Sequence, residues 1–585
     1  MTSGAAGRSE DPSGMIIEWD VPIQMSDGSV LRADVFRPDR HEPCPVLLGL
    51  GPYAKGLPFQ VGYPDQWSRL VGSHPEVMVG STGAHQNWEV PDPERWVPDG
   101  YACVRVDARG SGRSPGYLDP FSPREIRDLY EAIDWAGQQP WSDGKVALSG
   151  ISYLAINAWL VAGLAPPHLA AVIGWEGAAD WYRDMTHHGG ILCTFWEHWY
   201  EKQVLPVQYG VGERSPVNPH TGEHVAGSET FDDATLRANR VDLAAVIRSH
   251  PLDDAYHRER SADWPNVRVP FLSAANWGGL GLHSRGNFEA YTQASSPDRW
   301  LEVHGREHWT EYYTDYGRGL QRRFLARFLK DQRDAWGDEP RVRLWVREIG
   351  AFHKRAEADW PLARTEWTSF HLDARDPELG MSAVAPEAAG HIEYDATGHG
   401  VTFVADPADG ETEITGPLAA TLFVSSTTTD ADLFVVLRLF GPDGDEIVFQ
   451  GALDPHTPLS QGWLRASERK LDPSRSLPYR PYHPHDDSAL LEPARVYELA
   501  IEMWPTSIVI PTDYRLAFTV RGRDYEYAGP IGEVRLTTFK NAFRGSGPFL
   551  HDDPRDRPAD PFGGRVTVWT GPDHPSRILL PVIPS

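Results

Sequence analysis

The sequence of 585 residues is short of basic residues and contains no long apolar run. Its 55 Lys and Arg stand against 82 Asp and Glu, which gives a formal net charge of −27. This balance argues against nucleic acid or an anionic membrane as a partner, because both attract basic surfaces. No window approaches the ~20 apolar residues that cross a bilayer. We therefore expect neither a nucleic-acid partner nor a membrane partner.

Cysteine is scarce as well. Cys44, Cys103 and Cys193 are widely spaced, so they show no metal-ligand pattern and suit a reducing compartment. The chain also lacks an H-E-x-x-H motif, and its glycine-containing segment 107–114 lacks a P-loop lysine. We expect no metal and no other cofactor. Residues 1–14 are rich in Ser, Gly and Ala without the apolar stretch of a secretion signal, which predicts a disordered tail and a cytoplasmic protein.

Short apolar runs alternate with helical patterns in the first part of the chain. Residues 15–38 form two alternating apolar and polar segments around Asp27-Gly28, which predicts an antiparallel hairpin. Continuous apolar runs predict buried strands at 45–50, 101–106, 145–149, 169–175, 269–274 and 300–304. With helices between several of them, the pattern predicts an α/β fold, a mostly parallel sheet with helices on both faces, over 15–175 and 265–343.

Two further regions have different patterns. Residues 176–264 are rich in Trp, His and Gly, lack strand alternation and carry a helical stretch near 236–249, so we expect a helical cap insertion. From 344 to 585 strand-like pieces are separated by turns such as 440–444. This pattern predicts an all-β domain, a sandwich or jelly roll.

A serine stands between a strand and a helix at residues 146–162. The apolar strand ends at Gly150, Ser152 follows, and residues 156–162 are helical in pattern. A serine placed there exposes its hydroxyl at a helix N-terminus, where backbone N–H groups can stabilise an oxyanion. The segment therefore predicts a nucleophile elbow. The alternative is a helix-capping serine, because Ser is a preferred N-cap residue.

A base for this serine is expected after the last predicted strand, 300–304. In α/β hydrolases the order along the chain is serine, acid, histidine. His308 lies in the loop just past that strand and is the predicted base, whereas His304 at the strand end is expected to be structural. Tyr53 follows the strand at 45–50, where loops supply an oxyanion donor, although a turn tyrosine can also be a packing residue.

Several motifs belong to one known pattern. Residues 150–155 read G-I-S-Y-L-A and match G-x-S-Y-x-G except at Ala155. Residues 139–146 resemble QPW-x-[ND]-GKV, residues 107–114 resemble D-x-RG-x-G-x-S, and Gly51-Pro52-Tyr53 with Lys55 resembles an oxyanion-tyrosine segment. Together with the β-rich C-terminal half, including 430–433, these motifs resemble the CocE/NonD hydrolases, which include cocaine esterase and X-Pro dipeptidyl-peptidases.

The resemblance has consequences for fold and chemistry. It implies an α/β-hydrolase domain with a cap and a C-terminal jelly roll, and a serine hydrolase that cleaves a carboxylic ester or amide through an acyl-enzyme. It implies Ser152 as nucleophile, His308 as general base, and an oxyanion hole formed by the Tyr53 hydroxyl and the Tyr153 backbone N–H.

One position departs from the family pattern. The family carries its triad aspartate in G-W-[YF]-D, but the matching segment 274–279 has Gly279 at that place. A triad acid orients the imidazole, so another carboxylate is needed. We expect Glu176, just after the strand at 169–175, to supply it. Asp180 is the competitor, and a mere cap-pairing role for Glu176 is the alternative.

Three functions are open on this basis. The first is an ester or amide hydrolase acting on a small molecule, and the second an X-Pro aminopeptidase that uses Glu197 or Glu201 to bind an amine. The third is an impaired hydrolase fold that serves as a binding module, which Gly279 favours. The assembly is open between a monomer and a homodimer. We expect the substrate pocket to be lined by aromatic residues, with Trp181, Phe195, Trp196 and Trp277 as candidates and Tyr182 and Trp199 beside them in the cap.

Overall fold

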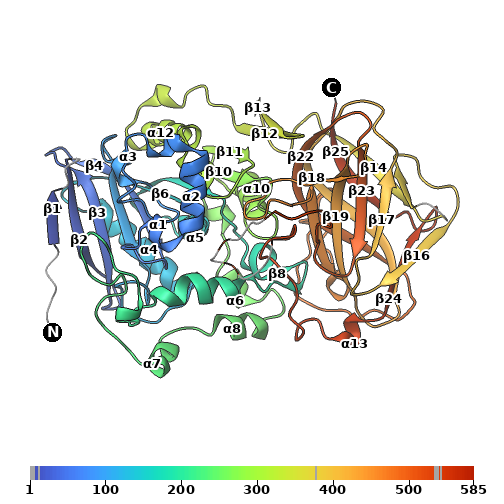
Figure 1. Ribbon diagram of the computed structural model, residues 1–585, viewed down its shortest axis with the longest axis horizontal. Coiled ribbons are helices and arrows are strands. Elements are labelled where there is room, and N and C mark those ends of the chain that lie inside the picture. Colours follow the sequence, from blue (N-terminus) through green and yellow to red (C-terminus); the bar gives the residue numbers. More distant parts are fainter. Residues whose placement is uncertain are drawn as a thin grey trace.

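The computed structural model describes residues 7–10, 14–375, 379–532, 536, 539 and 543–584. Two large sheets organise the chain, and Figure 1 shows them side by side, the N-terminal sheet with its helices at the left and the β-rich part at the right. Within the described ranges, no helix has the length and apolar character needed to cross a membrane.

The N-terminal sheet has 11 strands in the order β1-β2-β3-β5-β4-β6-β7-β10-β11-β12-β13. Strands from β5 to β12 in this order pair in parallel, and the others pair antiparallel. This confirms the predicted α/β fold. The strands are β1 Gly7–Glu10, β2 Met15–Gln24, β3 Val30–Pro38, β4 Cys44–Gly51, β5 Ala102–Asp107, β6 Ser142–Ile151, β7 Leu169–Trp175, β10 Phe271–Asn276, β11 Arg299–His304, β12 Val342–Glu348 and β13 Ala351–Glu357.

Helices pack against this sheet. Helix α5, Tyr153–Ala162, lies against β6 and β7, and all of its residues are buried. Such an apolar helix without a polar face is expected only inside a domain, so the serine before it is held by a rigid element. The other helices outside the cap are α1 Phe59–Gly62, α2 Pro64–Ser73, η1 Pro75–Met78, α3 Pro93–Trp96, α4 Pro123–Gly137, α10 Ser284–Gln293, α11 Thr310–Tyr313, α12 Asp315–Leu329 and η7 Arg333–Ala335.

Two predicted boundaries differ from the structure. Within the tail predicted to be disordered, Gly7–Glu10 form β1, which pairs with β2; residues 1–6 and 11–13 lie outside the described part. An edge strand leaves backbone groups unpaired, and a short segment can satisfy them. The N-terminal sheet also extends past the predicted limit at residue 343, because β12 and the antiparallel β13 continue it to Glu357.

Between β7 and β10 the chain forms short helices and one small hairpin. The predicted helical stretch 236–249 is two helices, α7 and α8. In Figure 1, α6, α7 and α8 lie below the sheet, and β8 lies where the two halves meet. The elements are η2 Trp181–Thr186, β8 His187–His188, β9 Ile191–Leu192, α6 Phe195–Trp199, η3 Tyr200–Val204, η4 Leu205–Val207, η5 Gly212–Arg214, α7 Asp233–Ala238, α8 Leu243–Ser249, α9 Ala255–Arg258 and η6 Trp264–Asn266.

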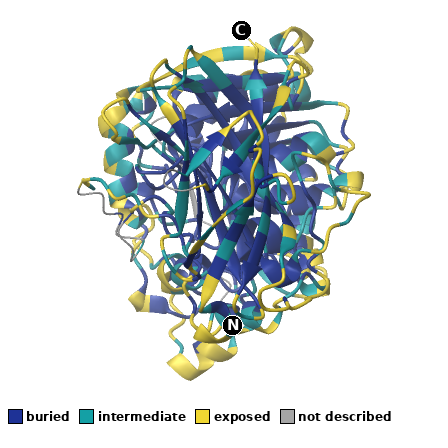
Figure 2. Ribbon diagram, turned by 90° about the vertical axis from the view of Figure 1, so that its right-hand side faces the viewer, coloured by how far each residue is buried: buried dark blue, intermediate teal, exposed yellow. Residues whose placement is uncertain are grey.

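The C-terminal part is built on a 12-stranded, mainly antiparallel sheet, which confirms the predicted all-β domain. Figure 2 looks onto this part and shows buried central strands beneath exposed loops. On β19 every second residue, from Leu433 to Leu439, enters an aliphatic core. The elements are β14 Glu366–Asp373, β15 Gly380–Ser382, β16 Gly390–Asp395, β17 Val401–Ala405, β18 Thr412–Ser426, β19 Asp432–Phe440, β20 Glu446–Ile447, β21 Ser460–Arg465, η8 Ala466–Glu468, β22 Tyr497–Ile510, β23 Arg515–Arg521, α13 Ala559–Phe562, β24 Arg565–Thr570 and β25 Arg577–Ile583.

The two halves share a packed interface. Ile191 of the small hairpin and Leu280 of the N-terminal half form one apolar cluster with Phe434, Trp463 and Trp504 of the C-terminal half. At the hairpin tip, a Cβ on Gly189 would lie 2.0 Å from the backbone oxygen of Trp463, so only glycine allows this approach. The cap is therefore held against the β domain by backbone contact as well as by side chains.

Candidate active site

Ser152 occupies a strained turn between β6 and α5. Its φ and ψ are 55° and −114°, and its side chain makes no capping hydrogen bond with α5. Non-glycine residues adopt such backbone angles only where the surrounding structure enforces them, typically at functional sites. A Cβ on Gly150 would lie 2.6 Å from the Cβ of Leu154, so a glycine is required there. This geometry matches the predicted elbow and excludes the helix-capping alternative.

Ala155 stands where the family motif has its last glycine. A Cβ on Gly177, in the loop after β7, would lie 2.7 Å from the Cβ of Ala155. The close approach between α5 and this loop is thus retained, with the glycine on the loop instead of the helix. The departure at Ala155 leaves the elbow geometry intact.

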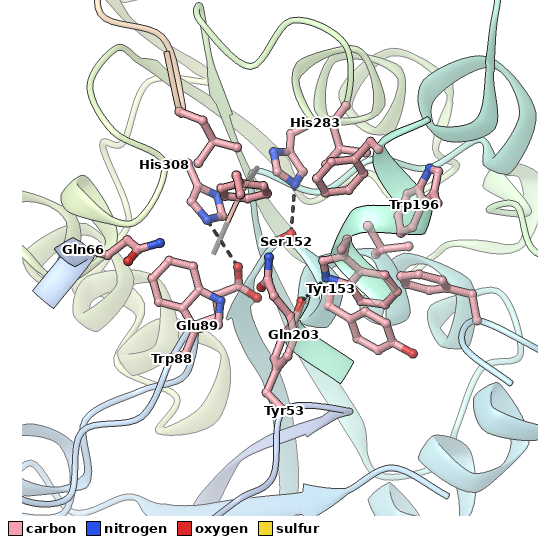
Figure 3. Close-up of a pocket in the computed structure, with 17 residues that line it drawn as sticks. Tyr53, Gln66, Trp88, Glu89, Ser152, Tyr153, Trp196, Gln203, His283 and His308 are labelled. Carbon is pink, nitrogen blue, oxygen red and sulfur yellow. Dashed lines mark hydrogen bonds and ion pairs between the residues drawn. The ribbon is translucent and has the colours of Figure 1, made fainter. Parts of the chain in front are cut away.

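The histidine in contact with Ser152 is His283. Its Nε2 lies 2.9 Å from the Ser152 Oγ, and Figure 3 shows the two side chains meeting in the cavity. His283 immediately precedes α10, in the segment that follows β10, so it approaches from the same carboxyl edge of the sheet as the elbow. Sequence reasoning missed it, although a histidine shortly after Gly279 lies in the segment where the family places its acid.

His308, the sequence-predicted base, lines the same cavity but does not hold that position. Its Nε2 lies 3.2 Å from Glu89 Oε1, and its Nδ1 lies 3.9 Å from Glu176 Oε2. Its ring is parallel to that of His283, with centroids 5.3 Å apart and an interplanar angle of 6°. The structure thus brings His308 beside the Ser152–His283 pair, with its Nε2 directed toward Glu89 (Figure 3).

Burial determines the protonation of His308, Glu89 and His283. It lowers the pKa of His308 to about 3 and raises the pKa of Glu89 well above its usual range, with Glu176 adding to the latter shift. The proton of the Glu89–His308 pair therefore sits on the carboxyl group. Burial and the neighbouring His308 likewise lower the pKa of His283, so both imidazoles are neutral.

Glu176 is fully buried and directed into the same region. Its Oε1 accepts hydrogen bonds from His304 Nε2 at 3.0 Å and Asn276 Nδ2 at 3.1 Å, while its Oε2 faces His308. Burial alone would lower the pKa of His304, but Glu302 and Glu176 raise it to about 10, so His304 is a buried cation between two carboxylates. His304 thus has the structural position expected of it, and the partners of Glu176, namely His304, Asn276 and His308, lie outside the cap residues 176–264.

Asp180, the competing acid, is committed elsewhere. Its side chain accepts the backbone N–H groups of Tyr182 and Arg183 at the start of η2. It also pairs with the Arg183 guanidinium at 2.9 Å. These contacts use both carboxylate oxygens for capping and charge pairing, so Asp180 is a structural residue of the cap.

Tyr53 and Tyr153, the expected oxyanion donors, both line the cavity. The Tyr53 hydroxyl accepts a hydrogen bond from Trp199 Nε1 at 3.1 Å, and burial raises its pKa well above the usual value, so it keeps its proton to donate. Tyr153 is the first residue of α5, and the first N–H groups of a helix have no partner within it. Its phenol donates to Glu125 at 2.7 Å, which fixes the start of the helix.

The glycine-containing segment after β5 positions the Tyr53 loop. Ser111 Oγ donates to the carbonyl oxygen of Pro52 at 2.6 Å, and Asp107 Oδ1 accepts the backbone N–H of Lys55 at 2.6 Å. The Lys55 ammonium group is buried among carboxylates, 2.9 Å from Asp34 Oδ1 and 4.0 Å from Asp107 Oδ2. Residues 107–114 therefore hold in place the loop that carries Tyr53, the expected oxyanion donor.

Comparison with known proteins shows the family to which this chain belongs. The family model described as X-Pro dipeptidyl-peptidase (S15 family) matches residues 27–310, and the model described as X-Pro dipeptidyl-peptidase C-terminal non-catalytic domain matches residues 334–579. A crystal structure of a CocE/NonD family hydrolase from Staphylococcus aureus is 31% identical with a TM-score of 0.81, covering 97% of this chain and 94% of that one. The chain belongs to the CocE/NonD hydrolase family.

Other relatives place this CocE/NonD hydrolase among esterases and peptidases. The cocaine esterase of Rhodococcus sp. (strain MB1 Bresler) is 25% identical over 96% of this chain and 98% of its own length. An aminopeptidase from a marine sediment archaeon, Thaumarchaeota archaeon, shares the fold with a TM-score of 0.64 at 18% identity, covering 99% of this chain and 97% of that one. The family is one of serine hydrolases, and its members differ in the bond they cleave.

The cavity of this CocE/NonD hydrolase holds about 490 Å³ of space, including its opening to solvent. Phe195 and Trp196 line it as expected, whereas Trp181 and Trp277 lie in the core. Trp181 packs on Phe121 and Trp196, and Trp277 donates to the Trp345 carbonyl. The lining residues are Tyr53, Gln66, Trp88, Glu89, Phe121, Ser152, Tyr153, Ile156, Phe195, Trp196, Trp199, Gln203, Leu282, His283, His308, Leu453 and Phe539.

The residues proposed as an anionic subsite are not part of this lining. Glu197 pairs with Arg248, and Glu201 pairs with Lys202 at 3.4 Å. Both carboxylates thus have basic partners outside the cavity of this CocE/NonD hydrolase.

Two clusters in the described part of the chain bring potential metal ligands within 4.8 Å of one another. One consists of Glu176, His283 and His308 in the cavity. The other consists of His188, Cys193 and His551, at the interface between the cap and the β domain.

Proposed function

We propose that this protein is a serine hydrolase that cleaves a carboxylic ester or amide through an acyl-enzyme, with Ser152 as nucleophile and His283 as general base. The observation that carries the proposal is the 2.9 Å contact between Ser152 Oγ and His283 Nε2 in a strained elbow. A nucleophile and a base within hydrogen-bonding distance are what acyl transfer by a serine requires.

The chemistry follows from this geometry. Ser152 Oγ attacks the substrate carbonyl carbon while its proton passes to His283 Nε2, and the carbonyl oxygen becomes an oxyanion. The Tyr53 hydroxyl and the Tyr153 backbone N–H stabilise this oxyanion. The intermediate then expels the leaving group, which takes the proton from His283. Water, activated by the same histidine, cleaves the acyl-enzyme and restores Ser152.

His308 and Glu176 support this pair in the proposal. His308 packs parallel to His283, its Nε2 lies 3.2 Å from Glu89 Oε1, and its Nδ1 faces Glu176 Oε2 at 3.9 Å. The arrangement expected from the sequence, with His308 as base and Glu176 as acid, requires His308 to replace His283 at the serine. The two arrangements make opposite predictions for the two histidines.

Acylation kinetics distinguish them. We expect His283→Ala to lower the rate of the acylation burst with a p-nitrophenyl ester by about 10²–10⁴, the usual contribution of general base catalysis. His308→Ala should lower it by a smaller factor. A larger loss in His308→Ala, with His283→Ala close to wild type, would assign the base to His308.

Labelling with a fluorophosphonate probe tests whether the protein is an enzyme at all. The wild-type protein should be labelled, and Ser152→Ala should not. Labelling that persists in Ser152→Ala places the nucleophile elsewhere. Absence of labelling in the wild type supports the alternative of a binding module on a hydrolase fold.

The cavity favours an ester with an apolar acyl or leaving group over an X-Pro dipeptide. Aromatic and aliphatic side chains dominate its lining. Its carboxyl group, Glu89, has a pKa raised well above the usual range by burial and by Glu176, so it is a poor anion for binding an α-amine. Parallel assays with p-nitrophenyl esters of several chain lengths and with X-Pro anilides test this preference, and faster turnover of the anilides would contradict it.

A further inference from the structure

Two buried histidines face each other where the cap meets the β domain. His188 ends β8, and His551 lies in the loop before α13. The Nδ1 of His188 and the Nε2 of His551 are 2.8 Å apart, and both side chains are 1% exposed or less. The contact joins positions separated by 363 residues.

The outer nitrogens of these rings determine their tautomers. His188 Nε2 lies 3.1 Å from the carbonyl oxygen of Asp184, which can only accept a hydrogen bond. His551 Nδ1 lies 2.7 Å from Asp524 Oδ1, and the other oxygen of Asp524 accepts the His551 backbone N–H at 2.7 Å. A neutral imidazole carries one N–H, which in both rings is therefore used on the outer side.

The facing nitrogens consequently both present lone pairs. Two lone pairs repel at 2.8 Å unless a positively charged species lies between the rings. That species is either an extra proton, which makes one ring an imidazolium, or a metal ion. The neighbourhood of the rings decides between these two.

Cys193 adds a third donor at the same point. Its sulfur lies within 4.8 Å of a ring nitrogen of each histidine, and the residue is buried. The adjacent Thr194 N–H donates to the Leu550 carbonyl at 2.8 Å, which ties the segment of Cys193 to that of His551. A sulfur donor is of no use to a shared proton, but it completes a set of soft and intermediate metal ligands.

We propose that His188 Nδ1, Cys193 Sγ and His551 Nε2 bind a Zn²⁺ ion that joins the cap to the β domain. Two histidines and a cysteine are ligands that zinc takes in proteins, and one buried water molecule would complete its tetrahedral coordination. The Asp524 carboxylate on the outer nitrogen of His551 and the Asp184 carbonyl on that of His188 are the outer-shell partners that orient metal-bound histidines. The ion lies outside the cavity of Ser152, so its role is structural.

The two histidine nitrogens require only a small adjustment. With Zn–N distances of about 2.0–2.1 Å, two nitrogens of a tetrahedral site lie about 3.3 Å apart. The rings must therefore separate by about 0.5 Å from their present 2.8 Å contact. Gly189 and Gly190, both with positive φ, form the turn next to His188.

Cobalt titration of the full-length protein tests the proposal. After dialysis against a chelator, we expect the wild type to bind one equivalent of Co²⁺ with a near-ultraviolet thiolate-to-cobalt charge-transfer band, which Zn²⁺ displaces. Cys193→Ser should lose the band and bind Zn²⁺ at least tenfold more weakly. Cys103→Ala, which removes a buried cysteine of β5, is the matched control and should keep both.

Thermal unfolding supplies a second measurement that does not depend on catalysis. Zn²⁺ should raise the Tm of the wild type and of Cys103→Ala, but not that of Cys193→Ser. No binding of either metal overturns the proposal and leaves a proton between the rings. Binding without a thiolate band, abolished by His283→Ala, overturns it in favour of the cavity cluster of Glu176, His283 and His308.

Discussion

His283 Nε2 lies 2.9 Å from the Ser152 hydroxyl, and His283 comes from the segment between β10 and α10 rather than from the loop after β11. In the family pattern implied by the sequence, the first of these segments supplies the acid and the second the base. Here Gly279 occupies the place of the acid, and a histidine of the same segment reaches the serine. In the proposed mechanism the base therefore comes from the segment that lacks the family's carboxylate.

Glu176 is proposed as the carboxylate that supports His283 and His308. We expect Glu176→Gln to lower kcat by about 10²-fold or more while preserving the fold, because the change removes the charge that faces His308 and pairs with His304. Steady-state kinetics with circular dichroism measure both effects. Asp180→Asn is the control: it loosens the η2 cap and should alter stability while leaving kcat within a few-fold. Near-normal turnover of Glu176→Gln would refute the role of this carboxylate.

Tyr53 is expected to donate to the oxyanion. Tyr53→Phe removes that hydroxyl, and we expect kcat to fall by about 10²–10³ with little change in KM, the usual cost of one oxyanion donor. Tyr63→Phe is the matched control, because its ring packs edge-on against Tyr53 at a centroid distance of 6.3 Å. Equal activity of the two variants in an ester assay would exclude the Tyr53 hydroxyl from the oxyanion hole.

Lys55 compensates buried carboxylates beneath the Tyr53 loop. Its ammonium group lies 2.9 Å from Asp34 and 3.3 Å from Asp20. Lys55→Met removes the basic partner of the buried Asp34, whereas Asp20 keeps Arg113 at 3.0 Å, so we expect the free energy of unfolding to fall by about 3–5 kcal/mol in urea titrations. Lys145→Met, which breaks the exposed pair with Asp331, should cost less than about 1 kcal/mol. A similar loss of unfolding free energy in both variants would contradict the role of Lys55 as the partner of a buried carboxylate.

Glu125 makes stability depend on pH. Burial raises its folded-state pKa to about 8 from an ordinary 4.5. Between these values the folded state holds a proton that the unfolded state has released, so stability should fall as pH rises from about 4.5 and level off above about 8. One such group contributes at most about 1.4 kcal/mol per pH unit. Glu125→Gln keeps an acceptor for Tyr153 and should flatten this slope in urea titrations, whereas an unchanged slope would contradict the prediction.

Local patterns of sequence were sufficient for much of the fold. The alternation of apolar runs and helices predicted the α/β sheet, and the strand-rich second half predicted the β domain. Both predictions need only the spacing of apolar residues within a single segment, which is visible in the sequence. The elbow at Ser152 follows from a strand, a glycine and an apolar helix in direct succession. Tyr53 and Glu176 were placed correctly at the sheet edge, since parallel strands end on the same side.

Contacts between distant segments escaped this reasoning. His283 reaches Ser152 across 131 residues, and Glu89, from a loop without a recognisable motif, contacts His308 Nε2 at 3.2 Å. Trp181 and Trp277 are as aromatic as the pocket residues Phe195 and Trp196, but helix packing turns them into the core.

The interface at His188, Cys193 and His551 shows most clearly that local sequence patterns do not reveal contacts between distant segments. Spacing along the chain gave no sign of a metal site there, since two ligands lie in the cap and the third in the β domain. The residue types that perform chemistry, their order and the sheet edge they occupy are properties of the sequence. The tertiary structure decides which histidine meets the serine and which side chains converge between the halves. These contacts join segments that are far apart in the sequence, so they depend on how those segments pack in three dimensions.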